Sequence, residues 1–346
     1  MMPLRLFSNI PQVATVATQM PCRATPAPIR TGPLAGLRIR PIDQAKRKGS
    51  IHGSRSDFER RNAMKNKCMT TMAAAALVAV ACIGLPGCSG GESQALRESV
   101  SQKLGTGSRA GETKTLALPD GVTMEMVWCP PGSFTMGSPE TEEGRTGSTS
   151  RSHNERQHRV TLTKGFWMAK TEVTQKQWKS VMGKNPSKFE GDNLPVENVN
   201  WFDCRNFCDK SGLQIPTEAE WEYACRAGTK GAYAGSGRLD DMGWHSGNSG
   251  KRTHPVGEKA PNSWGLFDMH GNVSEWCWDY VDAYPDTAVT DPTGPAVMDR
   301  GRIALRGLRG GNWERDAKEC RSADRGGGLP RDRYGRNGFR PVARPD

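Results

Sequence analysis

Gly265-Leu-Phe-Asp-Met-His-Gly-Asn-Val-Ser-Glu-Trp276 is the stretch on which the interpretation of the fold depends. It holds two carboxylates, Asp268 and Glu275, and Gly271, whose missing side chain permits a sharp turn that points backbone carbonyls inward. Carboxylate and carbonyl oxygens are the ligands that Ca²⁺ takes in proteins. The same residues also suit a plain turn that leads into a core strand around Trp276, and residue chemistry alone favours this simpler interpretation.

The charge of the chain is concentrated in its N-terminal part. The 346 residues carry a formal net charge of +11, which suggests an anionic partner. Residues 1–87 hold thirteen Lys and Arg and three Asp and Glu, so residues 88–346 carry a net charge of only +1. Nucleic-acid binding needs a dedicated basic face, so nucleic acid is excluded as the expected partner.

A basic segment followed by an apolar one marks the end of this N-terminal part. Lys65 and Lys67 precede an apolar run over 72–85, which ends in Leu85-Pro-Gly-Cys88. This order is typical of a secretory signal peptide, and the run is short for a membrane span. The ending resembles a bacterial lipobox, in which Cys88 is lipidated and becomes the mature N-terminus. We therefore predict an exported protein that its lipid anchors to a bacterial membrane, in the periplasm or at the cell surface.

These features divide the chain into four parts. Because a signal peptide begins a protein, translation is expected to start at Met64, and residues 1–63 are interpreted as a non-native or disordered extension. Residues 64–87 form the signal peptide. The polar residues 88–117 are expected to be a flexible tether, and residues 118–346 the folded domain.

Short periodic segments predict a mixed α+β domain with little regular structure. Ten tryptophans and few long apolar runs favour a loop-rich fold anchored by large aromatic side chains. Helices are predicted over 174–182, 201–210 and 217–226, begun by Thr174, Asn200 and Thr217. Strands are predicted over 122–128, 133–136, 159–163, 166–170 and 302–308, with Lys164-Gly165 joining 159–163 and 166–170 as a hairpin.

Several common catalytic motifs are missing from the sequence. It has no Gly-x-Ser-x-Gly elbow, no phosphate-binding Gly-x4-Gly-Lys loop and no clustered histidines. The Arg-rich stretch 300–344 is interleaved with acids, which favours structural ion pairs over an anion-binding face. The domain also holds six cysteines: Cys129, Cys204, Cys208, Cys225, Cys277 and Cys320. They could all be buried thiols or could form at least one disulfide, and the two alternatives are equally favoured.

Seven motifs in order resemble the formylglycine-generating enzyme family, also called sulfatase-modifying factor domains. They cover residues 118–344 and are Pro131-Gly-Ser-Phe-Thr-Met-Gly137, Glu172-Val-Thr174, 195–201, Pro216-Thr-Glu-Ala-Glu-Trp-Glu-Tyr-Ala224, 265–276, Arg309-Gly-Gly-Asn-Trp313 and Gly338-Phe-Arg340. The resemblance implies a single loop-rich mixed domain related to the C-type lectin fold. It also implies one structural calcium site, with the side chains of Asp268 and Glu275 and the carbonyls of Gly271 and Val273 as ligands.

The family's catalytic motif is broken in this chain. The resemblance implies oxidation of a sulfatase cysteine to formylglycine with copper held by a Cys-x4-Cys pair. Counted forward from Gly311, this pair falls at Arg315 and Cys320; counted back from Arg321-Ser-Ala-Asp-Arg325, three residues are deleted and Cys320 matches neither cysteine. A single thiolate cannot supply the two-sulfur coordination that suits Cu(I), so copper binding is doubtful. The family's disulfide positions also change, and a new pairing of Cys225 with Cys320 is a hypothesis.

Two functions are therefore open. The first is a divergent, non-catalytic, calcium-stabilised domain that binds a protein, peptide or glycan at the cell surface. The second is an active oxidoreductase that converts a sulfatase cysteine to formylglycine or oxidises another substrate, with Cys320 as its candidate catalytic residue.

Overall fold

The computed structural model describes residues 89–145, 153–296 and 303–345. Cys88, the predicted signal peptide and the N-terminal extension lie outside these ranges, so lipidation of Cys88 stays a prediction. Within the described ranges, no helix has both the length and the apolar character to span a bilayer.

The first sheet joins the beginning and the end of the folded domain. Its order is β1-β2-β5-β11, and all its pairings are antiparallel. The strands are β1 (Thr113–Ala117), β2 (Thr123–Cys129), β5 (Phe166–Ala169) and β11 (Val342–Ala343), with a 3-10 turn, η1 (Pro119–Gly121), between β1 and β2. All four side chains of β5 are buried, as expected for an inner strand of a sheet that is covered on both faces.

The second sheet corrects the predicted hairpin. It has the order β3-β4-β7 and consists of β3 (Gly132–Met136), β4 (His158–Leu162) and β7 (Val289–Thr290). β4 pairs antiparallel with β3, whereas β5 pairs with β2 and β11 in the first sheet. The predicted pairing of 159–163 with 166–170 is therefore wrong, because Lys164-Gly165 carries the chain from one sheet to the other. A side chain at Gly165 would meet the Trp128 ring at 2.3 Å, which explains the glycine at this crossing.

The third sheet holds the strand into which residues 265–273, the expected calcium-binding turn, lead. Its order is β10-β6-β8-β9, with β6 (Ser274–Tyr280), β8 (Arg306–Arg309), β9 (Gly326–Gly328) and β10 (Asn337–Gly338). β6 pairs antiparallel with β8 and parallel with β10. The expected core strand around Trp276 is thus present, and Trp276 is fully buried.

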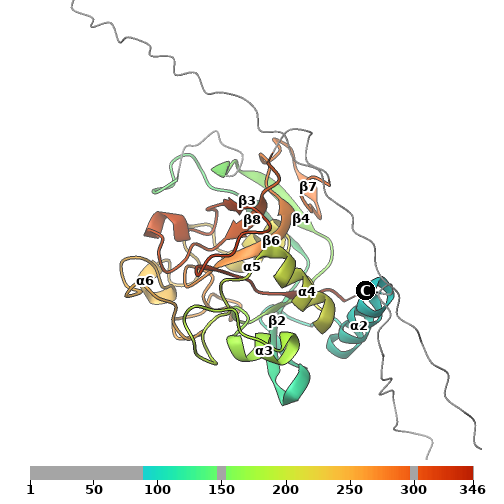
Figure 1. The fold of residues 1–346 in the computed structure, drawn as a ribbon. Helices are drawn as coiled ribbons and strands as arrows, with labels where there is room; N and C mark the ends of the chain where they lie inside the picture. The colour runs from blue at the N-terminus through green and yellow to red at the C-terminus, as the bar shows by residue number, and fades with distance from the viewer. Residues whose placement is uncertain (1–88, 146–152, 297–302, 346) are drawn as a thin grey trace, which may run out of the picture. The chain divides into compact units, whose positions relative to one another are not determined.

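The three predicted helices are confirmed: α3 (Gln175–Met182), α4 (Trp201–Ser211) and α5 (Glu218–Arg226). Each begins with a complete capping box, at Thr174, Asn200 and Thr217, in which the cap side chain and the side chain three residues later satisfy two backbone donors. A short helix, α6 (Leu239–Met242), lies in the loop-rich part of the chain that follows α5 (Figure 1).

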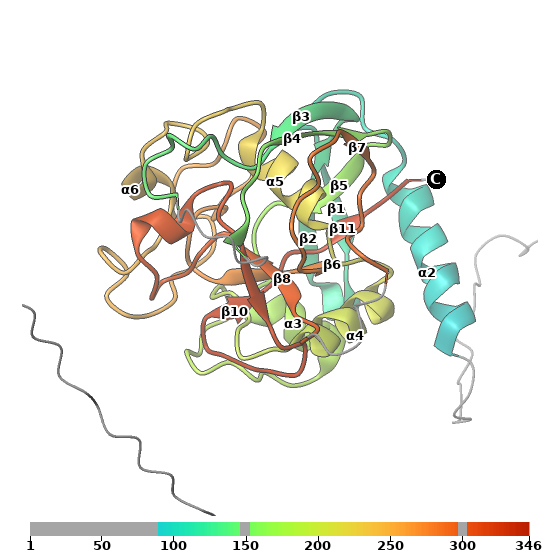
Figure 2. The same ribbon diagram turned by 90° about the horizontal axis from the view of Figure 1, so that it is seen from above.

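The segment expected to be a flexible tether is folded. Residues 89–104 form helix α2 (Ser89–Leu104), which contacts α4 and lies beside it in both views (Figures 1 and 2). Val100 and Leu104 are 6% and 2% exposed and belong to the same apolar core as Trp167. The Trp167 indole donates to the Gly105 carbonyl at 2.7 Å. Two buried apolar side chains one helical turn apart thus dock a mostly polar helix on the core, together with the ion pair from Arg97 to Asp209.

Tryptophans fill the two apolar cores, as the composition predicts. Trp167, Trp201, Trp221 and Trp276 are among the largest fully buried side chains. One core gathers α2, α3, α4 and the first sheet, and the other lies around α5 and its neighbours. Large aromatic side chains compensate for short strands because each one removes a large apolar area from water.

The arginines near the C-terminus form the expected network of buried ion pairs. Arg309 pairs with Glu222, Arg321 with Glu155, Arg325 with Glu218 and Arg340 with Glu275. All four guanidinium side chains are fully buried. They join the C-terminal segments to α5, to β6 and to the residues that precede β4.

Asp279 is a buried carboxyl close to this network without an ion pair among the described residues, and we expect it to make stability depend on pH. The Asp279 carboxylate accepts a hydrogen bond from the Glu218 backbone N–H at 2.9 Å. Burial and then the nearby Glu218 charge raise the pKa of Asp279 to about 8. This pKa in the folded state exceeds the ordinary pKa of the unfolded chain. At a pH between these two pKa values, Asp279 is protonated in the folded protein but ionised in the unfolded one. Stability should therefore fall as the pH rises through that window and level off above pH 8.

The replacement Asp279→Asn isolates this effect, because the amide oxygen can still accept from Glu218. Urea unfolding should show similar stabilities for the two proteins near pH 4, the ordinary Asp pKa, and a variant whose advantage grows up to pH 8 to 9. Asp324, whose pKa burial also raises, titrates in both proteins and so cancels in the comparison. Parallel stability curves from pH 5 to 9 would contradict the assignment.

Candidate functional site

The turn before β6 has the sharp geometry that its sequence predicts. Asp268 and Asn272 have left-handed φ angles of 56° and 57°. Gly271 has a φ of 131°, and a Cβ there would lie 2.1 Å from the Trp244 carbonyl oxygen. Only glycine fits this position without a backbone shift. The Asn272 N–H donates to the same Trp244 carbonyl at 2.8 Å, which fixes the turn against the neighbouring loop.

Asp268 is buried beside this turn with one carboxylate oxygen unpartnered. Its side chain is 1% exposed. Oδ2 accepts from the Gly257 N–H at 2.7 Å, whereas Oδ1 has no hydrogen-bond partner. Burial is the main cause that raises the pKa of Asp268 to about 6. A buried carboxylate oxygen without a donor is unfavourable unless a proton or a cation satisfies it.

Glu275, the other predicted carboxylate ligand, is already engaged by protein donors. The Arg340 guanidinium contacts both of its oxygens at 2.7 Å, and the Trp221 indole donates to Oε2 at 2.7 Å. Arg340 also donates to the Phe267 carbonyl at 2.8 Å, so it connects Glu275 to the start of the turn. Glu275 therefore has a structural role that the sequence did not indicate.

Glu172 is a third carboxylate at this site that sequence reasoning missed as a site residue. It is fully buried, and its two oxygens accept from the Val273 N–H at 3.1 Å and the Asn272 side-chain amide at 2.9 Å. Burial raises its pKa well above the usual value, and the charges of Asp268 and Glu275 add to this effect. Its only sequence signal was the motif Glu172-Val-Thr174, which gave no role to the carboxylate.

These residues form a buried cluster with excess negative charge. Glu172, Asp268 and Glu275 influence one another electrostatically, and Arg340 is the cation that lowers the pKa of Glu172 and of Asp268. Within 89–145, 153–296 and 303–345, no three His, Cys, Asp or Glu side chains have an arrangement that could hold a metal by themselves. The expected calcium site differs from such an arrangement because it uses two side chains and two backbone carbonyls.

The structure places Cys320 in the interior. It ends the short 3-10 helix η3 (Ala317–Cys320) and is fully buried. Its sulfur is close to Gly311, where a Cβ would meet it at 2.5 Å. Burial is the main cause that raises the pKa of the Cys320 thiol to about 12. A thiol in this setting is neutral at physiological pH, and the thiolate is the form that attacks substrates and binds metals.

Arg315, which one of the two alignments with the family motif places at its first cysteine, pairs with Glu319 at 2.8 Å. Cys225 and Cys320 flank the buried His270, whose Nδ1 bonds the Cys320 carbonyl at 2.8 Å and whose Nε2 lies 3.7 Å from the Cys225 sulfur. All six cysteines of the described residues are free thiols. The hypothetical Cys225–Cys320 disulfide is therefore absent from the structure.

Sequence comparison identifies the domain. The model of the sulfatase-modifying factor enzyme 1-like domain matches residues 113–345, beginning at β1. The chaperone protein LppX of Paenibacillus barcinonensis is 34% identical over 204 residues, which cover 42% of this chain and 72% of the relative. The formylglycine-generating enzyme of Streptomyces coelicolor is also 34% identical, over 191 residues, which cover 47% of this chain but only 59% of the enzyme.

Solved structures share the architecture. Treponema denticola variable protein 1 matches with a TM-score of 0.59 and 29% identity, covering 67% of this chain and 99% of that protein. PvdO from Pseudomonas aeruginosa matches with a TM-score of 0.56 and 28% identity, covering 69% of this chain and all of PvdO. These matches confirm the mixed, loop-rich, C-type lectin-like fold with few helices. The chain belongs to the family of sulfatase-modifying factor enzyme 1-like domains.

Proposed function

We propose that this protein is a binding domain of the sulfatase-modifying factor family without the family's copper-dependent oxidase chemistry. One observation carries the proposal: the remaining cysteine, Cys320, is a buried neutral thiol, and Arg315 stands where its partner would be. Two accessible thiolates are needed to hold Cu(I) in this motif. Neither the number of thiols nor the protonation state of Cys320 meets that need.

The relatives support a binding role. A relative that the chain covers well is named a chaperone, which makes a protein or peptide the favoured partner and a glycan the alternative. Export is proposed from the signal-peptide pattern, and anchoring from lipidation of Cys88. The lipid is then the protein's only membrane contact.

We propose one structural calcium ion at the turn before β6. The unpartnered Oδ1 of Asp268 and the excess buried negative charge fit a hard cation. Asp268 would be the main side-chain ligand, with the carbonyls of Gly271 and Val273. Glu275 would have to share oxygens that already contact Arg340 and Trp221. The ion would supply charge compensation and rigidity, and it has no part in chemistry.

An assay on a sulfatase-motif peptide tests the proposed loss of activity. We expect no copper-dependent conversion of its cysteine to formylglycine, because the thiol pair is missing. The Streptomyces coelicolor enzyme, loaded with copper in parallel, serves as the positive control. The measurement is the mass change of the peptide, with copper content determined on the same samples.

The variant Cys320→Ser distinguishes the two functions. Conversion by the wild-type protein that disappears in Cys320→Ser would refute the proposal and establish the oxidoreductase. Equal inactivity of both proteins, with less than stoichiometric copper, is the expected result.

A further inference from the structure

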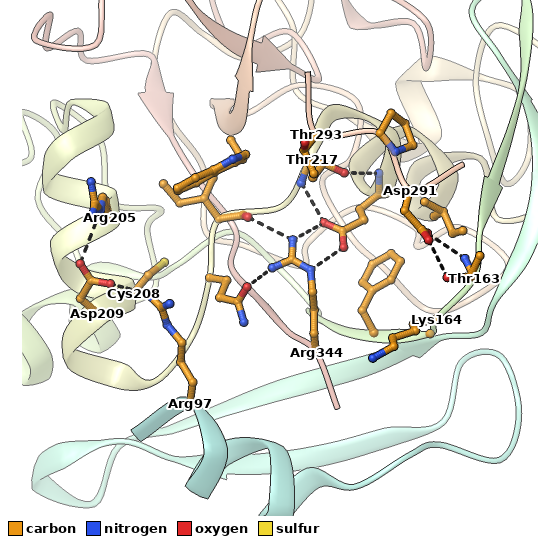
Figure 3. Close-up of a pocket in the computed structure, with 18 residues that line it drawn as sticks. Arg97, Thr163, Lys164, Arg205, Cys208, Asp209, Thr217, Asp291, Thr293 and Arg344 are labelled. Atoms are coloured by element: carbon orange, nitrogen blue, oxygen red, sulfur yellow. Dashed lines mark hydrogen bonds and ion pairs between the residues drawn. The ribbon is translucent and has the colours of Figure 1, made fainter. Parts of the chain in front are cut away.

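A cavity of about 570 Å³ lies between α2, α4 and the segment that joins β4 to β5 (Figure 3). Its volume lies within the range of small-ligand pockets. Its lining is completed by residues of the α4–α5 connection and the start of α5, by Trp278, by residues 291–293 and by Arg344. Glu172, Asp268 and Glu275, the carboxylates around the turn before β6, do not line the cavity, and neither does Cys320. The cavity is therefore separate from both sites discussed above.

One part of the cavity is apolar and firmly supported. Leu162, Phe166 and Ile215 line it and are otherwise buried in the domain. Trp278 also lines it and is 39% exposed, which is unusual for a tryptophan in this protein. The Trp278 ring lies 5.4 Å from that of Trp201, so it is held in place as a wall. A large exposed aromatic wall beside buried apolar side chains suits an apolar ligand group.

Three of the four cations that line the cavity are paired with carboxylates. Arg344 binds Glu220 at 2.6 Å. Arg97 and Arg205 share Asp209, at 2.6 Å and 3.6 Å. These contacts position the guanidinium groups, although Arg97 and Arg205 share a single carboxylate.

Lys164 is the fourth cation. Its ammonium group forms no ion pair or hydrogen bond with any residue that the structure describes. The nearby Asp291 carboxylate accepts instead from the backbone N–H and the hydroxyl of Thr163, at 2.8 Å and 2.5 Å. In Figure 3 the Lys164 side chain points away from Asp291. The lining thus holds four cations and three carboxylates, and its unused charge is positive.

We propose that this cavity binds a ligand with one anionic group on an apolar body. The ammonium of Lys164 receives the anion, and Trp278 and Ile215 contact the apolar body. An anion is favoured over a cation because each lining carboxylate already has a donor, whereas Lys164 has no acceptor. Two sources share this chemistry: a free aryl or alkyl carboxylic acid, and the C-terminal residue of a peptide. The proposal depends on neither calcium nor catalysis.

Titration calorimetry with 4-phenylbutyrate tests the charge requirement. We expect 4-phenylbutyrate to bind about tenfold more tightly than 4-phenylbutylamine, whose ammonium would face Lys164. Lys164→Gln should weaken 4-phenylbutyrate binding about fivefold, the upper range for an exposed charge pair, and Lys164→Arg should restore it. Lys176→Gln, which removes an exposed lysine on α3, is the matched control and should bind like the wild type. Equal binding of the acid and the amine, or an unchanged affinity in Lys164→Gln, would overturn the proposal.

Filling the cavity tests the position of the apolar body. Thr293 is exposed at the rim, so Thr293→Trp should place a large ring in the opening without disturbing the core. We expect this variant to keep the wild-type melting temperature and to lose 4-phenylbutyrate binding. Binding at wild-type affinity would show that the ligand sits elsewhere and would refute the assignment.

A peptide arm separates the two sources. A hexapeptide ending in a free phenylalanine carboxylate is compared with its C-terminal amide. Tighter binding of the free-acid peptide than of 4-phenylbutyrate, with loss in the amide, assigns the site to peptide C-termini. Binding of 4-phenylbutyrate without binding of either peptide assigns it to small acids. Binding of neither probe would overturn the proposal.

Discussion

Replacing Glu222 with alanine is expected to lower the free energy of unfolding by about 4 kcal/mol or more, because two buried guanidinium groups then lose their carboxylate. Glu222 is fully buried on α5. Its Oε1 accepts from Arg226 at 2.8 Å and from the Gly137 N–H at 2.9 Å, and its Oε2 pairs with the fully buried Arg309. Arg309 keeps its hydrogen bonds to backbone carbonyls in the variant, but no other carboxylate of the described residues forms an ion pair with it.

Thermal and urea unfolding measure this effect. A loss of this size should lower the melting temperature by about 10 °C in a domain of this length. Glu222→Gln retains one acceptor oxygen but no charge, so it should lie between the alanine variant and the wild type. Glu190→Ala removes an exposed glutamate and should change stability by less than about 0.5 kcal/mol. A loss below about 1 kcal/mol in Glu222→Ala would show that the ion pairs are not essential to the fold.

The helices were predictable because their signals are local. Thr174, Asn200 and Thr217 each bond a backbone N–H only three residues away, so the capping pattern is visible in the sequence. The pairing of β4 and β5 was not predictable in the same way. A short connection at Lys164-Gly165 suits a hairpin, and only the tertiary partners β3 and β2 decide that these strands belong to different sheets.

The fold of α2 shows a related limit of composition. Residues 89–104 are polar enough to suggest disorder, yet Val100 and Leu104 dock the helix on the core, and Arg97 pairs with Asp209 at 2.6 Å. This ion pair crosses more than a hundred residues of sequence. The composition of a segment is an average, so it cannot show whether two particular side chains, here Val100 and Leu104, pack against the core.

The sharp turn at Gly271 was predictable from the sequence, but the charge balance around it was not. The sequence grouped Asp268, Gly271, Val273 and Glu275, and the structure confirms the sharp turn at Gly271, with Glu275 in the strand that follows. It could not show that Arg340, which is distant in sequence, forms an ion pair with Glu275, or that Glu172 accepts a hydrogen bond from the Val273 N–H. The cavity beside α2 had no local signal at all, because its lining comes from segments spread from Arg97 to Arg344.

We expect the proposed calcium ion and the Arg340 ion pair to make separable contributions at this turn. In Glu275→Ala, the fully buried Arg340 loses its carboxylate, so we expect a loss of about 3 to 5 kcal/mol whether or not calcium is present. Any stabilisation by added Ca²⁺ should also disappear, because a carboxylate of the cluster is gone. Thermal unfolding in 1 mM Ca²⁺ and in chelator, for the variant and the wild type, measures both effects.

Asp268→Asn separates the two contributions, because Asp268 has an unpartnered oxygen and makes no direct ion pair with Arg340. Without calcium, the variant should be at least as stable as the wild type, since it removes one of three carboxylate charges around a single guanidinium. With calcium, the wild type should be the more stable protein, because binding only to its folded state adds stability by mass action. The order of the two melting temperatures should therefore reverse when calcium is added. If calcium shifts neither protein, the excess charge of the cluster is satisfied by protons, and the turn is held by Arg340 and the hydrogen bonds of Glu172 and Asn272 without a metal ion.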